Sequence, residues 1–395
     1  MNNVSIIGVG MTPVAEHWSI GLRQLGLQAM QAAMTDAGVQ DVDALVVGNA
    51  LAGLMSNQNH LGALMTDFAG MRGIEGVRVE AGDASGGLAL RQGMMLIASG
   101  AAEVVLVLGV EKATDMLAAD RQAILSAFLD ADYEAAMGAT PAGMMALVMR
   151  RYMSEHGVDL ASFAGFSVNA HQNGSANPNA MFRNKLKPEG FAKAPVVADP
   201  VNLFDIAPEA DGAAAVILAN SERAADMVPQ PIRILASAVA TDRLAVHDRE
   251  DPLYLAAVGL AAERAYAQSG LKPKDVDLLE LHDSSTIMAT LALEASGFAP
   301  RGHGWKLAAE GKIGLTGELP ISTFGGLKAR GNPLGATGVY QAVEAALQLR
   351  GQAGANQVAD ANIAMLQNVA TLGGTAVVHL LGNSNHWEAL DSCAS

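Results

Sequence analysis

Short runs of apolar residues alternate along the chain with longer stretches in which apolar positions recur every three or four residues. Runs rich in Val, Ile, Leu and Ala are typical of buried β-strands, and the longer stretches have the period of amphipathic helices. The pattern predicts eight strands, at Val4–Ile7, Ala44–Val47, Val104–Leu108, Ala214–Leu218, Ile232–Leu235, Leu278–Leu281, Ile363–Gln367 and Ala376–Leu380. It predicts helices at Gly21–Ala37, Gly87–Ser99, Tyr254–Ser269 and Thr337–Arg350. This alternation indicates an α/β protein.

The predicted elements form two sets, the first with the strands up to Leu218 and the second with the strands from Ile232 onward. The two sets resemble one another in their order of elements. In each set a strand and a helix that ends at glycine are followed by Asp-Val-Asp and a second strand, with this tripeptide at 41–43 and again at 275–277. A glycine-rich segment then precedes a later helix in both sets, at 82–87 and at 331–338. Two matched features in the same order favour an internal duplication.

Residues 116–199 interrupt the alternation of predicted strands and helices. They are rich in Met at first and then in polar residues, Pro, Gly and Asn, without clear strands, which is typical of an inserted and partly helical loop domain. We therefore expect an N-terminal half at 1–115 and 200–230, the insertion at 116–199, and a C-terminal half at 231–395. The residues after Asn383 are predicted to form a surface tail.

Composition and charge exclude several classes of protein. The 395 residues carry 25 Lys and Arg against 40 Asp and Glu, a net charge of −15, which disfavours a general binder of nucleic acid or anionic membrane. A single cysteine, Cys393, excludes a disulfide scaffold. No apolar run approaches the ~18–20 residues of a membrane-spanning helix, and no secretory signal is visible, so we expect a cytoplasmic protein. Zinc-type His and Cys spacings are absent, and no metal site is expected.

Several motifs resemble those of one known family. They are VSIIGVG at Val4–Gly10, Val79-Glu80-Ala81 with Ala84-Ser85-Gly86-Gly87, HQNGSANPNAMF at His171–Phe182, PEADGAAAV at Pro208–Val216, His282-Asp283, GGLKARGNPLGATG at Gly325–Gly338, and Asn368–His379. In this order they resemble the thiolase superfamily, and its sterol-carrier-protein-type and archaeal members in particular. The resemblance spans essentially the whole chain. It implies the thiolase fold, with duplicated αβαβα halves and an inserted loop domain.

The chain departs from the thiolase pattern at the chemical centre. The position of the family's nucleophilic cysteine is Asp83, and the histidine of its Gly-His-Pro motif is replaced by Asn332. Cys393 lies in the predicted tail and cannot substitute. A covalent acyl-cysteine step is therefore not available, and we expect no ordinary acetoacetyl-CoA thiolysis.

Asp83 precedes a glycine-rich helix start and has three possible roles. It can cap the helix, fill an oxyanion hole with its own charge, or act as a base. A helix N-terminus would lower the pKa of its carboxyl and weaken it as a base, so the sequence favours a structural role. Between oxyanion-hole occupant and base, it favours the occupant.

The resemblance implies further site residues. His282 follows a strand end and is expected to be an acid, a base or a donor to a thioester carbonyl, although a structural histidine is equally plausible. Asn332 can donate a hydrogen bond into an oxyanion hole or simply form a turn, but it cannot abstract a proton near neutral pH. Asn368 and Ala370 occupy the family's late catalytic loop, and the Ala370 amide is expected to line an oxyanion hole with that of Asp83.

Binding of coenzyme A is also an expectation from the resemblance. A short basic segment occurs in this acidic protein. It contains one acidic residue, Glu189, and four basic ones, Arg183, Lys185, Lys187 and Lys193. Such a run is usually solvated surface, but in this family the loop domain contacts the phosphates of coenzyme A, and Arg183 and Lys185 are the candidates here. We expect no permanently bound cofactor and a coenzyme A thioester as substrate.

Three functions fit these residues. The first is an enzyme of the acyltransferase family that forms or breaks a carbon–carbon bond of an acyl-CoA without an acyl-cysteine. The second is a degenerate subunit that supports an active thiolase, and the third is a scaffold for an OB-fold zinc-ribbon protein. The family's dimerisation implies at least a homodimer.

Overall fold

The computed structural model describes residues 3–383, and within them the sheet contains every predicted strand. The strands are β1 (Val4–Met11), β2 (Ala44–Gly48), β3 (Glu75–Val79), β4 (Val104–Glu111), β5 (Val196–Ala198), β6 (Val201–Asn202), β7 (Gly212–Asn220), β8 (Ile232–Thr241), β9 (Leu278–Glu280), β10 (Ile363–Val369) and β11 (Thr375–Gly382). Cys393 and the surface tail predicted around it lie outside the described residues.

Thirteen α-helices accompany these strands in residues 3–383. They are α1 (Leu22–Ala37), α2 (Ala52–Met55), α3 (Leu61–Phe68), α4 (Ser85–Ala98), α5 (Ala118–Leu125), α6 (Pro141–His156), α7 (Ala164–Gly174), α8 (Pro188–Ala192), α9 (Ser221–Met227), α10 (Ala256–Ser269), α11 (Thr286–Ala295), α12 (Gly304–Ala309) and α13 (Thr337–Leu349). The four helices predicted from periodicity correspond to α1, α4, α10 and α13. None of the helices in this part of the chain is long and apolar enough to cross a membrane.

Nine strands of the described chain form one mixed sheet in the order β3-β2-β4-β7-β1-β8-β11-β10-β9. The order is close to a mirror image about the β1–β8 junction, because β2-β4-β7-β1 on one side correspond to β9-β10-β11-β8 on the other. The junction itself is short, with Ser5 opposite Arg233 and Ile6 opposite Ile232. This symmetry is the structural form of the duplication that the sequence predicts.

Strand β3 is absent from the sequence prediction. It alternates polar and apolar residues over five positions and lies at the edge of the sheet, partly exposed. Its counterpart in the second half is a single bridge between Leu279 and Ile321. Short edge strands lack the continuous apolar run that identifies buried ones.

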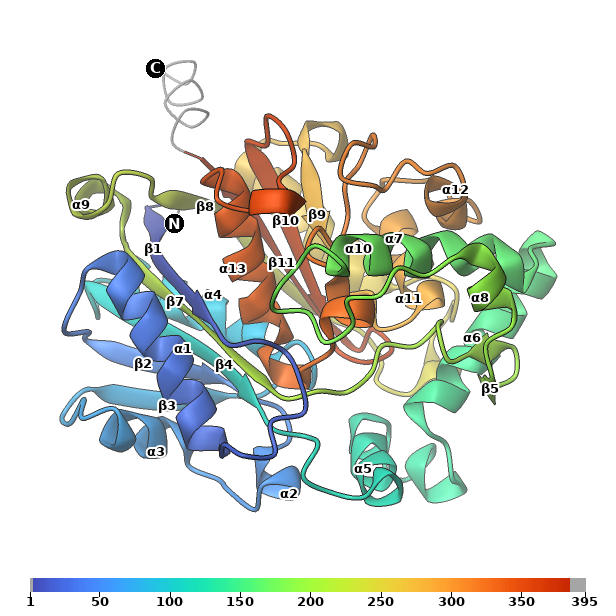
Figure 1. The fold of residues 1–395 in the computed structure, drawn as a ribbon, viewed down its shortest axis with the longest axis horizontal. Helices are drawn as coiled ribbons and strands as arrows, with labels where there is room; N and C mark the ends of the chain where they lie inside the picture. Colours follow the sequence, from blue (N-terminus) through green and yellow to red (C-terminus); the bar gives the residue numbers. More distant parts are fainter. Residues whose placement is uncertain (1–2, 384–395) are drawn as a thin grey trace.

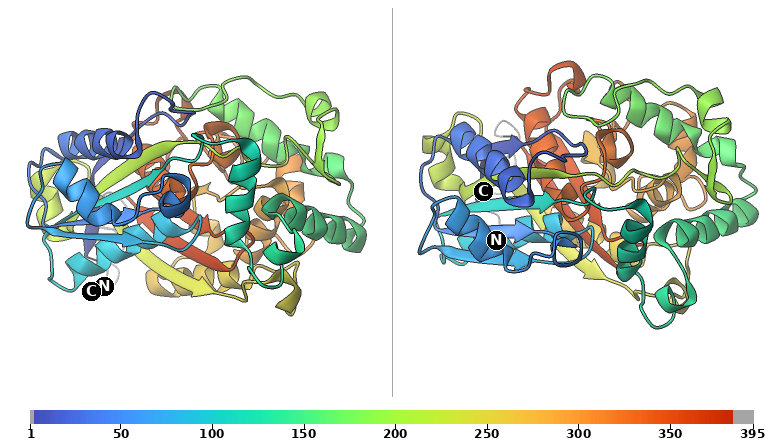
Figure 2. Two further views of the ribbon diagram at one scale, coloured as in Figure 1. Left: turned by 90° about the horizontal axis from the view of Figure 1, so that it is seen from below. Right: turned by 60° about the horizontal axis from the view of Figure 1, so that its bottom comes forward.

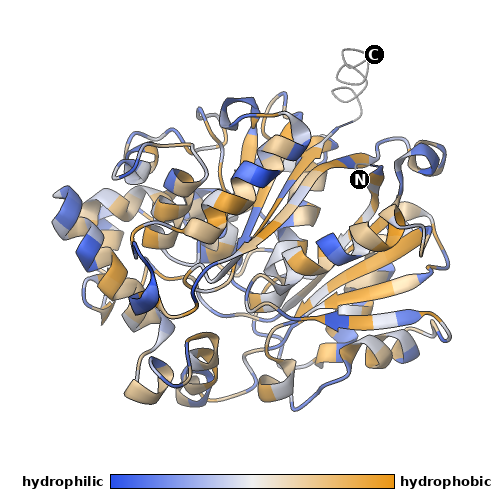
Figure 3. Cartoon of the chain, turned by 180° about the vertical axis from the view of Figure 1, so that it is seen from behind, coloured by the Kyte–Doolittle hydropathy of each residue, from blue (hydrophilic) through white to orange (hydrophobic). Residues whose placement is uncertain are grey.

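Helices cover the sheet in layers (Figure 1). Helices α4 and α13 pack on one another and contact strands of both halves, so they form the central layer. Helix α1 covers the outer face of the first half, and α10 covers that of the second. Figure 2 shows the same arrangement from two further sides, and Figure 3 shows the hydrophobic colouring concentrated on the strands. The result is the αβαβα layering expected of the thiolase fold.

The segment 116–199 contributes no strand to the nine-stranded sheet. It contains α5 to α8, and its one strand, β5, pairs only with β6 in a separate two-stranded ribbon. Figure 1 shows α6 to α8, in green shades, beside the second half, and α5, in teal, at the bottom of the view. The segment is partly helical, as expected, while the domain boundaries remain a prediction.

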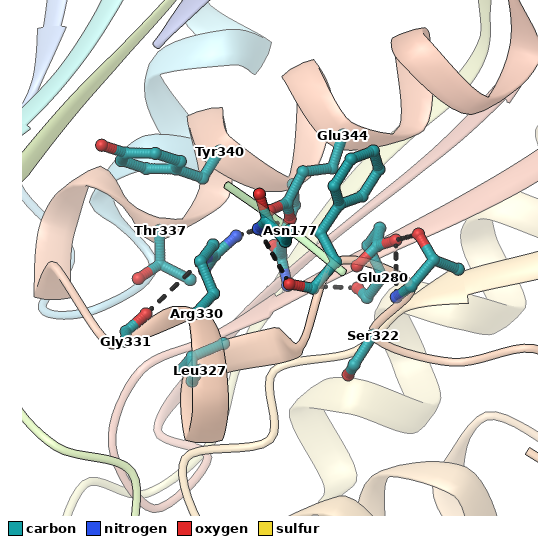
Figure 4. A network of polar contacts seen from close by, with 12 residues as sticks. Asn177, Glu280, Ser322, Leu327, Arg330, Gly331, Thr337, Tyr340 and Glu344 are labelled. Atoms are coloured by element: carbon teal, nitrogen blue, oxygen red, sulfur yellow. Dashed lines mark hydrogen bonds and ion pairs between the residues drawn. The ribbon is translucent and has the colours of Figure 1, made fainter. Parts of the chain in front are cut away.

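A buried ionic cluster lies beneath the turn that precedes α13. The π-helical turn η6 (Gly326–Arg330) carries Arg330, whose Nη1 donates to Glu344 Oε2 at 2.5 Å. Both side chains are essentially inaccessible to water. Figure 4 shows Arg330 reaching toward Glu344 and Tyr340 on α13, and its guanidinium lies 5.0 Å from the centre of the Tyr340 ring. Burial raises the pKa of both Glu344 and the neighbouring Glu280.

The buried ion pair predicts that replacing its glutamate costs more stability than replacing its arginine. Glu344→Gln is expected to destabilise the protein by about 3–5 kcal/mol, because a buried arginine keeps its charge and would lose its partner. Arg330→Met is expected to cost less, since the two glutamates can then take up protons. Urea unfolding at pH 7 measures both free energies.

The matched control is Asp67→Asn, at the exposed pair with Arg72, where the Nε to Oδ1 distance is 3.2 Å. An exposed pair contributes about 0–1 kcal/mol. Equal losses for Glu344→Gln and Asp67→Asn would contradict the prediction.

Candidate active site

Asp83 lies where the two halves of the molecule meet, directly before α4. Its side chain is buried, but it does not cap the helix: the residue before α4 is Ala84, and no side chain caps that end. The carboxylate Oδ2 instead accepts hydrogen bonds from Thr371 N and Thr371 Oγ1, each at 3.1 Å. The predicted capping role is therefore wrong, because the carboxylate turns toward the β10–β11 connection of the other half.

Burial raises the pKa of Asp83 to about 6, against the lowering effect of the two Thr371 hydrogen bonds. The sequence-based expectation of a lowered pKa is wrong, because desolvation outweighs hydrogen bonding and α4 donates nothing to the carboxylate. The second oxygen, Oδ1, is buried without a hydrogen-bond partner among the described residues. The carboxyl thus has one fixed oxygen and one free oxygen.

Thr371 is a residue that sequence reasoning missed. It has φ of 37°, a left-handed conformation that is costly for a β-branched side chain. The turn is held by Ala370 N donating to Thr375 O at 2.8 Å and Gly373 N donating to Ala370 O at 2.7 Å. The strained turn aims both Thr371 donors at Asp83.

The Ala370 prediction needs correction at the same turn. Because the Ala370 amide donates to Thr375 O, it is not free to line an oxyanion hole in this structure. The neighbouring Thr371 amide points at Asp83 instead. The amide that points at Asp83 is therefore one residue later than predicted. The conformation of the turn determines the direction of each amide, and the sequence alone does not define that conformation.

Asn368 links Asp83 to His282. Its Oδ1 accepts from Gly87 N at 2.9 Å, and its Nδ2 donates to Asp83 O at 3.1 Å. The same Nδ2 lies 3.2 Å from His282 Nδ1. Since Nδ2 is a donor, His282 Nδ1 must accept, and the ring proton is on Nε2.

His282 is a neutral imidazole in this environment. Burial, with a smaller contribution from the charge of Arg330, lowers its pKa to about 3. A lowered pKa favours the neutral ring, which suits hydrogen-bond donation, one of the alternatives that the sequence left open. Its Nε2 is buried without a partner in residues 3–383, and His282 does not line the large cavity described below.

Asn332 lies in the same cavity wall as Asp83. Its Oδ1 accepts from Leu334 N at 3.1 Å and from Thr337 Oγ1 at 2.9 Å, so the turn-forming role is real. Its backbone pairs with residues 208–210, through Asn332 N to Pro208 O at 2.9 Å and Ala210 N to Asn332 O at 3.0 Å. With its oxygen engaged, its Nδ2 group makes no hydrogen bond to another described residue and can donate to a ligand.

A cavity of about 470 Å³ opens over Asp83. This volume lies within the ~300–1,000 Å³ of small-molecule sites. Its wall is mostly apolar and combines the segment 122–145, the loop around 197–209 and the Asp83 centre, with Asp83, Gln122, Leu125, Phe128, Pro141, Ala142, Met145, His171, Phe182, Val197, Leu203, Phe204, Ile206, Ala207, Pro208, Glu209, Ser284, Lys328, Asn332, Leu334 and Thr371 as lining residues. We call it cavity 1.

Three further polar residues of cavity 1 were not predicted individually. Lys328 Nζ donates to Leu203 O and Ile206 O, at 2.8 and 2.5 Å, and burial lowers its pKa to about 8. Burial raises the pKa of Glu209 and lowers that of His171. All three residues lie in motifs that carry the family resemblance. The sequence therefore identified the motifs but not the place of these three side chains in the cavity wall.

Arg183 and Lys185 are exposed and do not line cavity 1. Phe182 before them does line it, and Asn184 O between them accepts from His171 Nδ1 at 2.9 Å. The two cations therefore flank a segment that forms part of the cavity wall. Across residues 3–383, no group of three or more His, Cys, Asp or Glu side chains is placed to hold a metal ion.

The sequence matches two family models, "Thiolase, N-terminal domain" over residues 4–222 and "Thiolase C-terminal domain-like" over residues 238–383. It is 42% identical to an acetyl-CoA acetyltransferase of Methanothermobacter thermautotrophicus over 96% of this chain and 99% of that protein. It is 31% identical to sterol carrier protein 2 of Gallus gallus, over 95% of this chain and 71% of the relative.

A solved structure of the Ltp2-ChsH2(DUF35) aldolase superposes with a TM-score of 0.84 at 26% identity, covering 96% of this chain and 98% of that one. The two family models match successive parts of the chain, and the superposed structure has the same fold. The chain belongs to the thiolase superfamily and is similar to its sterol-carrier-protein-2 and archaeal members.

Proposed function

We propose that this protein forms or cleaves a carbon–carbon bond next to the thioester of an acyl-CoA, with Asp83 as the general acid and base and without an acyl-cysteine. The observation that carries the proposal is that Asp83 lines cavity 1, with one carboxyl oxygen bonded to Thr371 and the buried Oδ1 without a hydrogen-bond partner among the described residues. A pKa of about 6 lets it both take and return a proton near neutral pH.

An aldol-type reaction fits a single carboxyl best. In the cleavage direction, Asp83 takes the proton of a 3-hydroxyl group, and the bond between Cα and Cβ breaks. Its electron pair moves to Cα and forms the thioester enolate, while Cβ becomes a carbonyl carbon. Asp83 then returns the proton to Cα. One proton moves from oxygen to carbon, and no thiolate nucleophile is needed, whereas thiolysis needs one.

The enolate oxygen requires hydrogen-bond donors. Asn332 is the proposed donor, because it lines cavity 1 and its Nδ2 is free of the turn. We assign His282 a positioning role, since it contacts Asn368, and Asn368 contacts the backbone of Asp83. The likeness to a solved aldolase supports the same reaction class.

Proposed partners follow the same reasoning. The substrate is an acyl-CoA, with Arg183 and Lys185 near its phosphates, and no permanently bound cofactor is needed. A homodimer in the cytoplasm, and an accessory OB-fold zinc-ribbon protein, remain proposals; the similar aldolase is a complex with a DUF35 component. A degenerate subunit would bind acyl-CoA without catalysing proton transfer, and a scaffold would do neither.

The reaction can be tested through its enolate, by the exchange of acyl-CoA α-protons with D₂O. We expect NMR to detect exchange of propionyl-CoA α-protons with wild type, rising with pH around a midpoint near 6 because only the carboxylate is a base. Asp83→Asn should lose exchange while retaining acyl-CoA binding. No exchange in wild type, together with tighter acyl-CoA binding by Asp83→Ala, would instead support a carboxylate that occupies the oxyanion hole.

Thr371→Ala provides a matched variant for this experiment. It removes one of the two hydrogen bonds that lower the pKa of Asp83, so the midpoint of exchange should move to higher pH while exchange persists. A change in rate with no movement of the midpoint would argue against Asp83 as the titrating base.

The raised pKa also predicts a dependence of stability on pH that needs no activity. Asp83 has a pKa of about 6 in the folded protein and ~3.9 in an unfolded chain, so folding favours its protonated form. Its contribution is complete below about pH 4 and is lost as the pH rises through about 6. Asp83→Asn should therefore gain about 2–3 kcal/mol relative to wild type between pH 4 and pH 8. Urea unfolding across this range measures the difference, and parallel curves would contradict it.

Coenzyme A binding is tested by thermal unfolding. A ligand at one hundred times its dissociation constant stabilises a protein by ~2.7 kcal/mol, so coenzyme A should raise the melting temperature. Arg183→Ala with Lys185→Ala should weaken this shift and its dependence on salt. Lys272→Ala with Lys274→Ala removes the same charge at another exposed site and should leave the shift intact. Equal effects from both pairs would show a general charge effect.

A further inference from the structure

The carboxyl of Asp83 has very little contact with water. The residue is 4% exposed, its Oδ2 accepts two hydrogen bonds from Thr371, and its Oδ1 is buried. Because its pKa is about 6, the carboxyl must release a proton before it can act as a base near neutral pH. That proton needs a path to solvent, and such a path requires a second group that can hold a proton and also meets water.

Among the described residues, four ionisable ones line cavity 1, namely Asp83, His171, Glu209 and Lys328. His171 is buried, and its Nδ1 donates to Asn184 O at 2.9 Å. Lys328 is buried as well, and its Nζ donates to two backbone carbonyls. The side chain of Glu209 is 20% exposed. Glu209 is therefore the ionisable group of the cavity wall that is both close to Asp83 and accessible to water.

Glu209 is held at the site by the backbone of Asn332, the proposed donor to the enolate oxygen. The two residues form a parallel bridge. Asn332 N donates to Pro208 O at 2.9 Å, and Ala210 N donates to Asn332 O at 3.0 Å, so the chain is fixed on both sides of Glu209. The negative charge of Glu209 contributes to the raised pKa of Asp83, so the two carboxyls are near enough to interact.

The carboxyl of Glu209 has a cationic neighbour that does not bind it tightly. Arg121 Nε lies 3.6 Å from Glu209 Oε2, which is within ion-pair range but longer than a hydrogen bond. Burial raises the pKa of Glu209, and the charge of Arg121 opposes this effect. A raised pKa makes it easier for Glu209 to hold a proton in transit, while the ion pair keeps its carboxylate in place.

From this arrangement we propose that Glu209 is the proton relay between Asp83 and solvent, with water in cavity 1 completing the path. This rests on the proposed function. In α-proton exchange, the Asp83 carboxylate takes the proton, and the electron pair of the C–H bond forms the enolate. Asp83 passes the proton through water to Glu209, which releases it to solvent. A deuteron returns by the same path to Cα, so one proton is replaced by one deuteron and the acyl-CoA is otherwise unchanged.

The relay is tested with Glu209→Gln, which keeps the size of the side chain and removes its carboxyl. In D₂O at pH 8 with dilute buffer, we expect NMR to show exchange of propionyl-CoA α-protons falling by about tenfold or more, because Asp83 returns the proton that it took. Added imidazole, a small base, should restore exchange in Glu209→Gln and have little effect on wild type. Glu209→Ala should behave in the same way, whereas Glu209→Asp keeps a carboxyl and should retain most of the exchange.

Glu80→Gln is the matched control. The charge of Glu80 also raises the pKa of Asp83, but Glu80 does not line cavity 1. Replacing either glutamate removes one negative charge near Asp83, so both variants should move the midpoint of exchange to lower pH. At pH 8, where Asp83 is ionised in wild type and in both variants, only Glu209→Gln should lose exchange and respond to imidazole.

The relay is overturned if exchange is unchanged in Glu209→Gln, if Glu80→Gln loses as much, or if imidazole does not restore what is lost. Thermal unfolding with coenzyme A verifies that each variant is folded and binds its ligand. Absence of exchange in wild type would instead refute Asp83 as a base, and with it the proposed function. Exchange in wild type that does not depend on Glu209 would refute the relay alone.

Discussion

The side-chain amide of Asn368 is the contact on which the site depends. It stands on β10 in the second half, and it bonds the Gly87 amide, the Asp83 carbonyl and the His282 ring. The first two belong to the glycine-rich start of α4 in the first half. One amide therefore links the two halves at the site, holds the loop that carries Asp83, and determines which nitrogen of His282 carries the proton.

Close backbone packing makes this contact possible. A Cβ atom on Gly338 would lie 2.2 Å from Gly87 N and 2.3 Å from Asn368 Oδ1, so only glycine allows α13 and α4 to approach. The approach brings Asn332, which precedes α13, into the same cavity wall as Asp83. The duplicated fold thus places two glycine-rich helix starts face to face and builds the candidate site between them.

The protonation state of each group at the site depends on whether desolvation or hydrogen bonding has the larger effect on its pKa. Desolvation raises the pKa of Asp83 to about 6 despite two hydrogen bonds, and it lowers the pKa of His282 to about 3. Where the family resemblance implies a cysteine and a histidine, this chain has the carboxyl of Asp83, with a pKa of about 6, and the neutral amide of Asn332. Such a centre is suited to moving a proton, which is what an aldol reaction requires.

Local signals were enough to predict the buried strands of the large sheet, the main helices, the duplication and the family, because apolar periodicity and glycine-rich motifs can be read from neighbouring residues. They missed the short, partly exposed strand β3. They also identified Asp83, Asn332, His282 and Asn368, since each stands in such a motif. Tertiary contacts were needed to establish that Asp83 bonds Thr371 and not α4, and that the Ala370 amide is already engaged. Asp83 and Thr371 are 288 positions apart, and burial, which sets the pKa values, depends on everything packed around a group. Neither the long-range contact nor the burial is encoded in a short stretch of chain.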